Sequence, residues 1–386
     1  MLFLSTADQV NTGGKPQEDA MKIAVIGGGV IGVSCATHLA QAGAAVTLFT
    51  DTDWASGASG RSLSWLNASG PWPDTYYQLR MAGIARYQQL HHQQGPFDWL
   101  KFPGGIFWSD PKEVTEWHQA ETAHGYASEF YPSVDAVSAI EPRVNPQASD
   151  SPVLFNPGEG WVHLPDLITR LLATLTVCGG ISRTGCGKVR PVSGDDGQIT
   201  GIRLPDGSHE NFDKVLIACG ADTPALLASL GYRLPDGSVL SMLALSEPAD
   251  SLPERVFNTP RVALRPHPGQ ALAIDHSWYV DDIQRQADDS YQVSEAITTQ
   301  LFAEADRILS LPAPLTLSGY KAGPKPVPAD GFPVVGAVPG YEGCFVAFTH
   351  SGATLALIIG ELLSGEILCG TRHPMLADFR PERFHQ

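Results

Sequence analysis

Three glycines near the N-terminus, Gly27, Gly29 and Gly32, have the spacing of a turn that can hold a phosphate group. In such a turn the first glycine permits a sharp bend and the second lets the backbone approach a pyrophosphate. The third lets the following helix pack closely on the preceding strand. The first amides of that helix, Val30 and Ile31, would point at the anion and carry part of the positive end of the helix dipole. We therefore predict a dinucleotide site at this turn.

The residues around the turn meet the other requirements of the motif. The apolar run 23–26 predicts a buried strand before the turn, and the run 46–49 predicts a second strand after a helical segment. An acidic residue is needed about 20 residues further on, and Asp51, followed by Thr52, occupies that place. Many such proteins end the second strand with Glu, where this chain has Thr50. We therefore expect either that Asp51, one position after the usual Glu, contacts the ribose hydroxyls, or that a water molecule takes this role.

A run of small residues with one cation follows directly. It contains Ser59, Gly60, Arg61 and Ser62. Backbone amides in such a loop can approach a phosphate or a flat ring, and an arginine can neutralise part of a pyrophosphate's charge. The alternative interpretation is a flexible surface loop, which the position beside the dinucleotide unit disfavours.

Two later segments have residue types that suit a bound anion or ring. Residues 212–218 predict a buried strand that ends in Cys219 and Gly220, where glycine lets a backbone come close to a ligand. The last long helix is expected to begin at 349–354, and its free amides can stabilise negative charge. The residues concerned are His350, Ser351, Gly352, Ala353 and Thr354. Between these segments, 323–336 reads as a proline-stiffened loop that contains Lys325 and leads into a short strand.

The order of elements predicts an α/β fold with two domains. A Rossmann-like dinucleotide-binding domain is expected to take residues 21–75, 152–228 and 318–386. A second, α+β substrate domain built on an antiparallel sheet is expected to take residues 76–151 and 229–317. Helices are predicted over 75–94, 113–124, 166–175 and 294–309, a hairpin over 97–108, and strands over 187–192, 199–204, 239–245, 262–265, 271–274 and 278–280.

Composition narrows the classes of partner. With 25 basic and 41 acidic residues the chain carries a formal charge of −16, which disfavours nucleic acid. The six cysteines lack C-x-x-C pairing, which favours reduced thiols in a cytoplasmic protein and no metal site. Residues 1–20 read as a disordered extension, and 344–363 as a buried strand and helix rather than a transmembrane segment.

Three of these blocks together resemble the D-amino-acid oxidase-like (DAO) family of flavoproteins, which includes glycine oxidase, sarcosine oxidase and D-amino-acid dehydrogenase. They are the N-terminal unit with its 56–61 loop, the strand 215–221, and the 325–336 loop followed by His350, Ser351 and Gly352. The resemblance implies an extended FAD across the first domain, with further contacts at Val189 and Gly336. It also implies hydride transfer from a small amine or amino acid to the flavin, with electrons passed on to oxygen or to an electron-transfer acceptor.

The chain also departs from the family pattern. Where many relatives have Gly-x-Arg-Pro, with the arginine on the substrate carboxylate, this chain has Gly-Pro-Lys-Pro at 323–326. Lys325 offers a point charge without a planar fork, and it is either a substrate or flavin contact or a solvated loop lysine. The cysteine that carries covalent flavin in monomeric sarcosine oxidase would fall near Gly323, so FAD is expected to be non-covalent. His350 either polarises the flavin or holds its loop in place.

Three alternatives to an oxidase remain open at the level of sequence. The first is a dehydrogenase of the same fold that passes electrons to a quinone or a partner protein. The second is a flavin-binding subunit that mainly scaffolds a complex. The third is a nicotinamide enzyme, because the glycine-rich turn alone does not distinguish the two dinucleotides.

Overall fold

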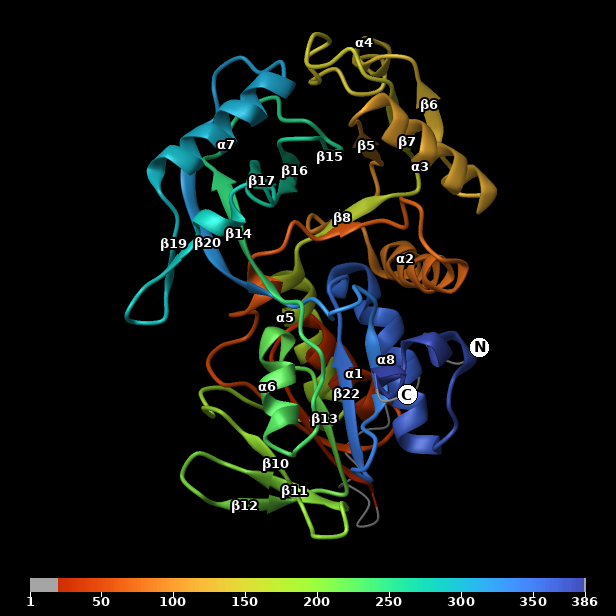
Figure 1. Cartoon of the computed structure of the whole chain (residues 1–386), viewed down its shortest axis with the longest axis vertical. Helices are drawn as coiled ribbons and strands as arrows, with labels where there is room; N and C mark the ends of the chain where they lie inside the picture. Colours follow the sequence, from red (N-terminus) through yellow and green to blue (C-terminus); the bar gives the residue numbers. More distant parts are fainter. Residues whose placement is uncertain (1–19, 385–386) are drawn as a thin grey trace.

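The computed structural model describes residues 20–384, so nearly all of the predicted N-terminal extension lies outside the described residues. Figure 1 shows two lobes, with a mostly parallel sheet in the lower lobe and a larger sheet in the upper lobe. The chain passes between the lobes several times, so each lobe is built from separate stretches of sequence. This arrangement confirms the predicted fold class, a Rossmann-like domain joined to an α+β domain.

The lower sheet has six strands in the order β21-β22-β13-β1-β2-β9. Their bounds are β1 Lys22–Ile26, β2 Ala45–Phe49, β9 Ile181–Arg183, β13 Lys214–Ile217, β21 Val334–Ala337 and β22 Cys344–Phe348. Five of them run parallel, and β21 runs antiparallel to β22 at one edge. The carboxyl ends of the parallel strands therefore meet at one edge, where α/β sheets bind ligands.

Apolar residues cover both faces of this sheet. Along β1, Ile23 and Val25 pack in one core with the helices α1 (Val30–Gln41), α5 (Leu164–Val177) and α8 (Gly352–Cys369). Ala24 and Ile26 point the other way, into a second core. That core is covered by α6 (Thr223–Ala228) and a small antiparallel sheet of β10 (Arg190–Ser193), β11 (Ile199–Arg203) and β12 (His209–Asn211). Burial on both faces explains why these strands read as continuous apolar runs.

The upper sheet has eight strands in the order β20-β14-β17-β16-β15-β5-β7-β6. Their bounds are β5 Gly105–Phe107, β6 Glu129–Tyr131, β7 Val153–Asn156, β14 Val239–Ser246, β15 Val256–Asn258, β16 Ala263–His267, β17 Ala271–Asp275 and β20 Leu317–Lys325. Neighbours are antiparallel except β15 and β5. Helix α7 (Glu295–Ile308) packs on one face and forms a separate apolar core with it.

The remaining elements connect the lobes or lie at their edges. They are α2 Asp74–Gln94, α3 Pro111–Ala123, α4 Val134–Val137, a three-stranded sheet of β3 Trp65–Leu66, β8 Gly160–Val162 and β4 Leu100–Lys101, the pair β18 Gln284–Arg285 and β19 Tyr291–Gln292, and the short 3-10 helices η1 Ala58–Gly60, η2 Gly220–Asp222, η3 Val280–Asp282, η4 Pro374–Phe379 and η5 Pro381–Phe384.

The long predicted helices are confirmed to within a few residues, but two local predictions are wrong. Residues 97–108 do not form a hairpin, because β4 pairs with β8 while β5 pairs with β7 and β15. Gly104, at φ +95°, turns the chain from one sheet into the other. A Gly-Gly pair is also typical of hairpin turns, so the sequence pattern did not distinguish the two. Residues 278–280 are not a strand, since the chain turns there and brings the Tyr279 hydroxyl to Asp275.

Sheet membership also differs from the expected domain ranges at two strands. β7 and β20 lie in segments assigned to the dinucleotide-binding domain, yet both belong to the upper sheet. β20 pairs with β14 along its whole length, from Leu317 to Lys325. The part of the expected proline-stiffened loop from Gly323 to Lys325 is therefore the end of a strand, and Lys325 belongs to the upper lobe.

Helix α8 is long and apolar enough to cross a membrane by length and composition, with a mean hydropathy of 1.6. Two thirds of it is buried inside the structure, and it packs against α1 and α2. A buried core helix can have the same length and apolar composition as a transmembrane helix, so burial explains the composition of α8.

Candidate functional site

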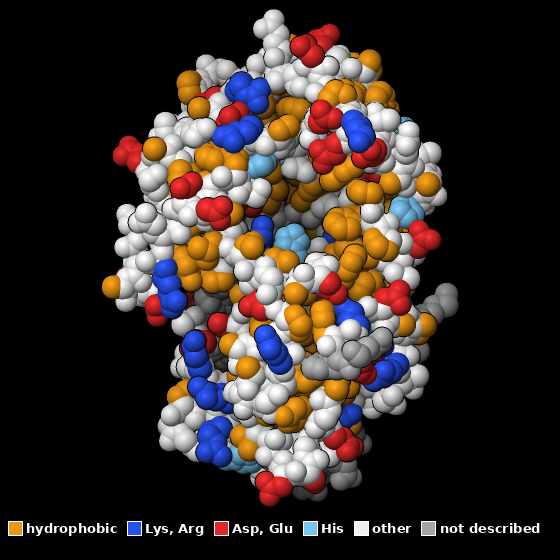
Figure 2. Space-filling view, in the orientation of Figure 1, with side chains coloured by type: hydrophobic (Ala, Val, Ile, Leu, Met, Phe, Trp, Pro, Cys, Tyr) orange, Lys and Arg blue, Asp and Glu red, His pale blue; other side chains and the backbone are white. Residues whose placement is uncertain are grey.

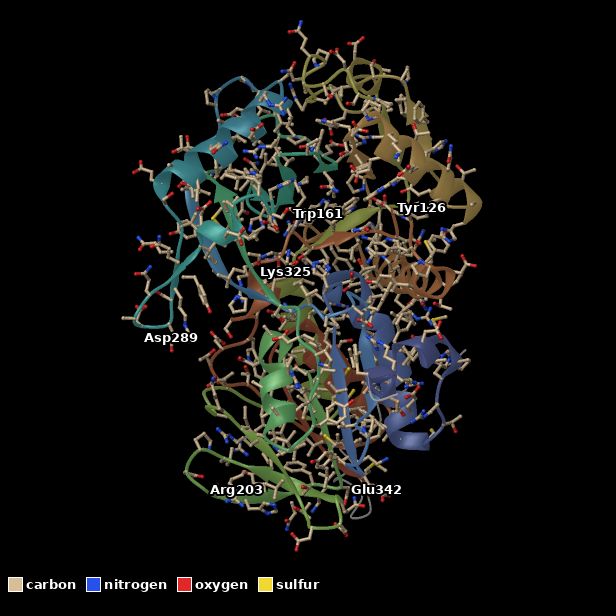
Figure 3. All side chains as sticks on the ribbon, in the orientation of Figure 1. Tyr126, Trp161, Arg203, Asp289, Lys325 and Glu342 are labelled. Atoms are coloured by element: carbon tan, nitrogen blue, oxygen red, sulfur yellow. The ribbon has the colours of Figure 1, made fainter. Side chains whose placement is uncertain are left out.

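A cavity of about 890 Å³ lies between the lobes, at the carboxyl ends of β1, β2 and β13. Figure 2 shows the molecule hollowed at this level, and Figure 3 places Lys325 between the two lobes. The lower wall is formed by the glycine-rich turn, the 56–65 loop and the start of α8. Ser241, Asp275 and Lys325 of the upper sheet line the opposite wall.

The glycine-rich turn approaches its neighbours so closely that side chains are excluded. A Cβ at Gly27, whose φ is +134°, would overlap the carbonyl oxygen of Ala218, and one at Gly32 would overlap the carbonyl of Gly27. Gly27, Gly29, Val30 and Ile31 line the cavity, whereas Gly32 serves the contact between helix and strand. The Val30 amide donates to the Ser59 hydroxyl at 2.9 Å, which ties the turn to the following loop.

The end of β2 forms one end of the cavity. The Asp51 side chain is exposed there, and Thr50 is buried against Gly28, where any Cβ would overlap the threonine. The Gly187 and Gly185 amides donate to the carbonyls of Asp51 and Thr52 at 3.1 and 2.8 Å. These bonds bring the loop before β10, including Val189, to the cavity wall.

Arg61 links the 56–65 loop to the upper lobe. Its Nη2 donates to the Pro324 carbonyl at 2.5 Å and its Nη1 to the Ser56 carbonyl at 3.4 Å. Burial lowers the pKa of this guanidinium, and its Nε has no hydrogen-bond partner within residues 20–384. Ser59, Arg61 and Ser62 line the main cavity. Gly60 instead packs on the Ala55 carbonyl and lines a smaller neighbouring cavity.

The start of α8 provides another part of the wall, through residues 350–354. Ser351 accepts hydrogen bonds from the Tyr76 hydroxyl and from Arg80 Nη1, both at 2.7 Å. His350 is exposed to the cavity while protein encloses its other sides. Burial lowers the pKa of its imidazole to about 4, with smaller effects of the Lys325 and Arg80 charges, so the ring is neutral at pH 7.

Arg80 is a cavity residue that the sequence prediction missed. It is buried, its Nε and Nη2 donate to Asn67 at 3.0 and 2.6 Å, and it lies over the rings of Trp72 and Tyr76. A charged residue one position after Leu79, on the apolar face of a predicted helix, was the available signal.

Asp275 and Ser241 were also missed. Asp275 is the last residue of β17, and it accepts a hydrogen bond from the Tyr279 hydroxyl at 2.8 Å. Burial raises the pKa of its carboxyl group to about 6, against the opposing effect of the Lys325 charge. No local pattern distinguishes this aspartate from one at any exposed strand end.

Of the remaining predicted contacts, two lie in the cavity wall and one does not. Cys219 donates weakly to the Ile26 carbonyl, and burial raises the pKa of its thiol to about 12. Gly220 begins η2 at φ +57°. Gly336 does not line the cavity, because its missing side chain makes room for Arg380 from the C-terminal segment.

The arrangement fits an extended dinucleotide with a flat ring at one end. The turn leaves no Cβ between its amides and the cavity, and the polar loops at β2 and β10 lie at the ribose end expected from Asp51. The opposite end meets the upper sheet, whose Lys325 and Asp275 supply opposite charges. These residues fit FAD, and within the described part of the chain no group of three metal-ligating side chains occurs.

Comparisons with known proteins agree in family and fold. A family model described as FAD dependent oxidoreductase (DAO) matches residues 22–365. The chain is 27% identical over 364 residues to a glycine oxidase from Pseudomonas aeruginosa, covering 89% of this chain and 95% of that protein. It is 26% identical over 382 residues to a glycine oxidase from Pseudomonas putida, covering 94% and 98%.

Solved structures show the same fold at lower identity. A glycine oxidase from Geobacillus kaustophilus superposes with a TM-score of 0.77 at 21% identity, covering 94% of this chain and 99% of that one. An L-amino acid deaminase from Proteus myxofaciens gives a TM-score of 0.82 at 14% identity, covering 97% and 95%.

Proposed function

The chain belongs to the DAO family of FAD-dependent oxidoreductases, and from this premise we propose that it oxidises the carbon–nitrogen bond of a small amino acid. The single observation that carries the proposal is the position of Lys325. At the end of β20 in the upper sheet, Lys325 lines the same cavity as the glycine-rich turn. A cation at that position suits a substrate carboxylate. The glycine oxidases among the relatives support the same substrate class.

FAD, held without a covalent bond, supplies the hydride acceptor. We assign its pyrophosphate to Gly27, Gly29, Val30 and Ile31, and its ribose to Asp51 and Thr52. The loop residues Ser59, Arg61 and Ser62, together with Val189, Cys219 and Gly220, line the same cavity and are proposed as further FAD contacts. Gly32, Gly60 and Gly336 act indirectly, through the packing that shapes the wall.

The protein's part in the reaction is orientation and electrostatics. Lys325 attracts the carboxylate as a point charge and so favours one orientation of the reacting C–H bond. Residues Gly352 to Thr354 line the cavity at the start of α8, and the free amides of this helix terminus can stabilise negative charge that develops there. Neutral His350 adds an uncharged donor or acceptor at the same wall, so it does not repel the Lys325 ammonium.

Oxygen is the proposed electron acceptor, and the cytoplasm the proposed location. The location is supported by six cysteines that are all free thiols, which is typical of a reducing compartment.

The test is anaerobic mixing of the purified yellow protein with a panel of amino acids and simple amines. Loss of the oxidised-flavin absorbance with amino acids, followed by peroxide formation when oxygen is admitted, is the expected result. Bleaching without peroxide would replace oxygen by another electron acceptor. A flavin that stays oxidised with the whole panel would refute the proposed function.

A further inference from the structure

Three neighbouring strands of the upper sheet present polar side chains to the cavity. They are Lys325 of β20, Ser241 of β14 and Asp275 of β17. Side chains alternate along a strand, and the neighbours Met242 and Ile274 lie in the apolar core on the other face of the sheet. The sheet register therefore fixes Ser241 and Asp275 toward the cavity.

A hydrogen bond holds the Asp275 side chain in place, but no cation pairs with its negative charge in the described part of the chain. The Tyr279 hydroxyl donates to its Oδ1, and Tyr279 is itself fully buried against the sheet. Within residues 20–384 the carboxylate forms no ion pair, although the Lys325 charge is close enough to act on it. Opposite charges thus face one cavity without being joined to each other. A ligand that carries both a carboxylate and a nitrogen donor complements this pair.

We propose that Asp275 accepts a hydrogen bond from the nitrogen of the substrate and stabilises the positive charge that develops there. This inference rests on the proposed amino-acid oxidation and names its substrate class: amino acids with at least one N–H on the reacting amine. Primary and N-monoalkyl amino acids meet that condition. The neutral form of an N,N-dialkyl amino acid has no N–H to donate.

The chemistry explains why a carboxylate is useful at this position. The C–H bond breaks, its electron pair leaves as hydride to FAD, and the nitrogen lone pair closes a C=N bond. The nitrogen therefore becomes cationic as the hydride leaves. A fixed carboxylate that faces this atom in a cavity of low dielectric stabilises the transition state more than the ground state.

The same assignment predicts a pH dependence. The groups that face Asp275 are Lys325 from β20 and Tyr279 and the His276 amide from its own segment, while Arg80 and His350 lie in the opposite wall. Since burial raises the pKa of Asp275 to about 6, its carboxylate becomes protonated as pH falls through that value. We expect kcat/KM to decrease on the acidic side with this pKa in the wild type, and the Asp275→Asn variant to lack this step.

The experiment compares Asp275→Asn with Asp281→Asn, an exposed aspartate on η3 that undergoes the same change of charge. The rate of flavin reduction by the best amino acid of the panel should fall about 10- to 100-fold in Asp275→Asn, the loss expected for a hydrogen bond to a charged group. Asp281→Asn should match the wild type. Calorimetric binding of acetate, which has a carboxylate and no amine, should be at least as tight in Asp275→Asn as in the wild type, because the variant removes a negative charge near Lys325.

Each result decides for or against the inference. Equal reduction rates in wild type and Asp275→Asn would overturn it while leaving the proposed function intact. Loss of acetate binding together with activity would also overturn it, because Asp275 would then act by maintaining the shape of the cavity and not on the substrate nitrogen. Should the variant not fold, the wild type decides alone: oxidation of N,N-dimethylglycine as fast as of N-methylglycine contradicts the inference. A wild-type flavin that no amino acid reduces refutes the proposed function itself.

Discussion

Lys325 brings a compact ammonium to the position where the Gly-x-Arg-Pro pattern of many family members leads us to expect a planar guanidinium. A lysine attracts a carboxylate as a point charge, so it gives affinity with less control of orientation. We expect Lys325→Met to raise KM for the amino-acid substrate about 10- to 100-fold, as for loss of a charge-assisted hydrogen bond, with a smaller change in kcat. Steady-state kinetics check this.

The matched control is Lys321→Met, which removes an exposed lysine four residues earlier on β20. It should leave KM unchanged. Lys325→Arg should recover most of the affinity. A Lys325→Met enzyme with wild-type KM would show that this lysine does not contact the substrate.

Gly27 is a second residue whose type is dictated by its neighbours. Its φ of +134° is rare for side chains, and a Cβ would overlap the Ala218 carbonyl. Gly27→Ala should destabilise the fold by at least about 2 kcal/mol and sharply lower the bound flavin content. Urea unfolding and the flavin-to-protein absorbance ratio measure both effects.

For comparison, Gly365→Ala places a methyl group where no atom lies within 4 Å, on the exposed side of α8. Helix propensity predicts a gain of up to about 1 kcal/mol there and full flavin content. Equal behaviour of the two variants would mean that the turn tolerates a side chain.

At the scale of elements, α8 positions both the cavity wall and the C-terminal segment. Glu366 of α8 pairs with Arg380, which follows η4, at 2.5 and 2.6 Å, and both side chains are buried. Removing one partner of a buried pair leaves an uncompensated charge, at a cost of about 3–5 kcal/mol. We expect that loss for Arg380→Met, measured by urea unfolding.

Two comparisons separate this effect from a general loss of packing. The Glu366→Met, Arg380→Met double variant removes both charges and should recover a large part of the loss. Arg372→Met breaks the solvent-exposed pair of Arg372 with Glu382 and should cost at most about 1 kcal/mol. A single variant as stable as Arg372→Met would contradict the importance of the buried pair.

For the whole molecule, the cavity lies between lobes that the chain crosses repeatedly, so a ligand bound there contacts both sheets. A ligand that binds only the folded state stabilises it by mass action, by about 2.7 kcal/mol at 100 times its Kd. FAD added to the apoprotein should therefore raise the midpoint of thermal unfolding in a concentration-dependent way.

Riboflavin is the informative control, because it has the ring system but lacks the pyrophosphate and adenosine. It should raise the midpoint much less than FAD at the same concentration, since the glycine-rich turn then contributes nothing. Equal stabilisation by the two would place the main binding contacts away from Gly27 to Gly32.

The amino-acid sequence by itself determined the family, the fold class and the glycine-rich turn, because these depend on local spacing. Gly27, Gly29 and Gly32 are separated by fixed intervals, and a strand before them and a helix after them follow from periodicity. The start of α8 could be predicted from the sequence for the same reason. Those features need no knowledge of which distant segments meet.

Only the tertiary structure decided which residues face the cavity from the upper lobe. Asp275, Ser241 and Arg80 come from three separate elements, and their side-chain directions depend on sheet register and helix packing. In the structure, Gly32, Gly60 and Gly336 do not line the main cavity, although the sequence predicted FAD contacts there. Lys325 lies at the end of β20 and not in the predicted loop. Strand pairing over long sequence separations fixes such positions, and a one-residue change of register would turn each strand residue to the opposite face.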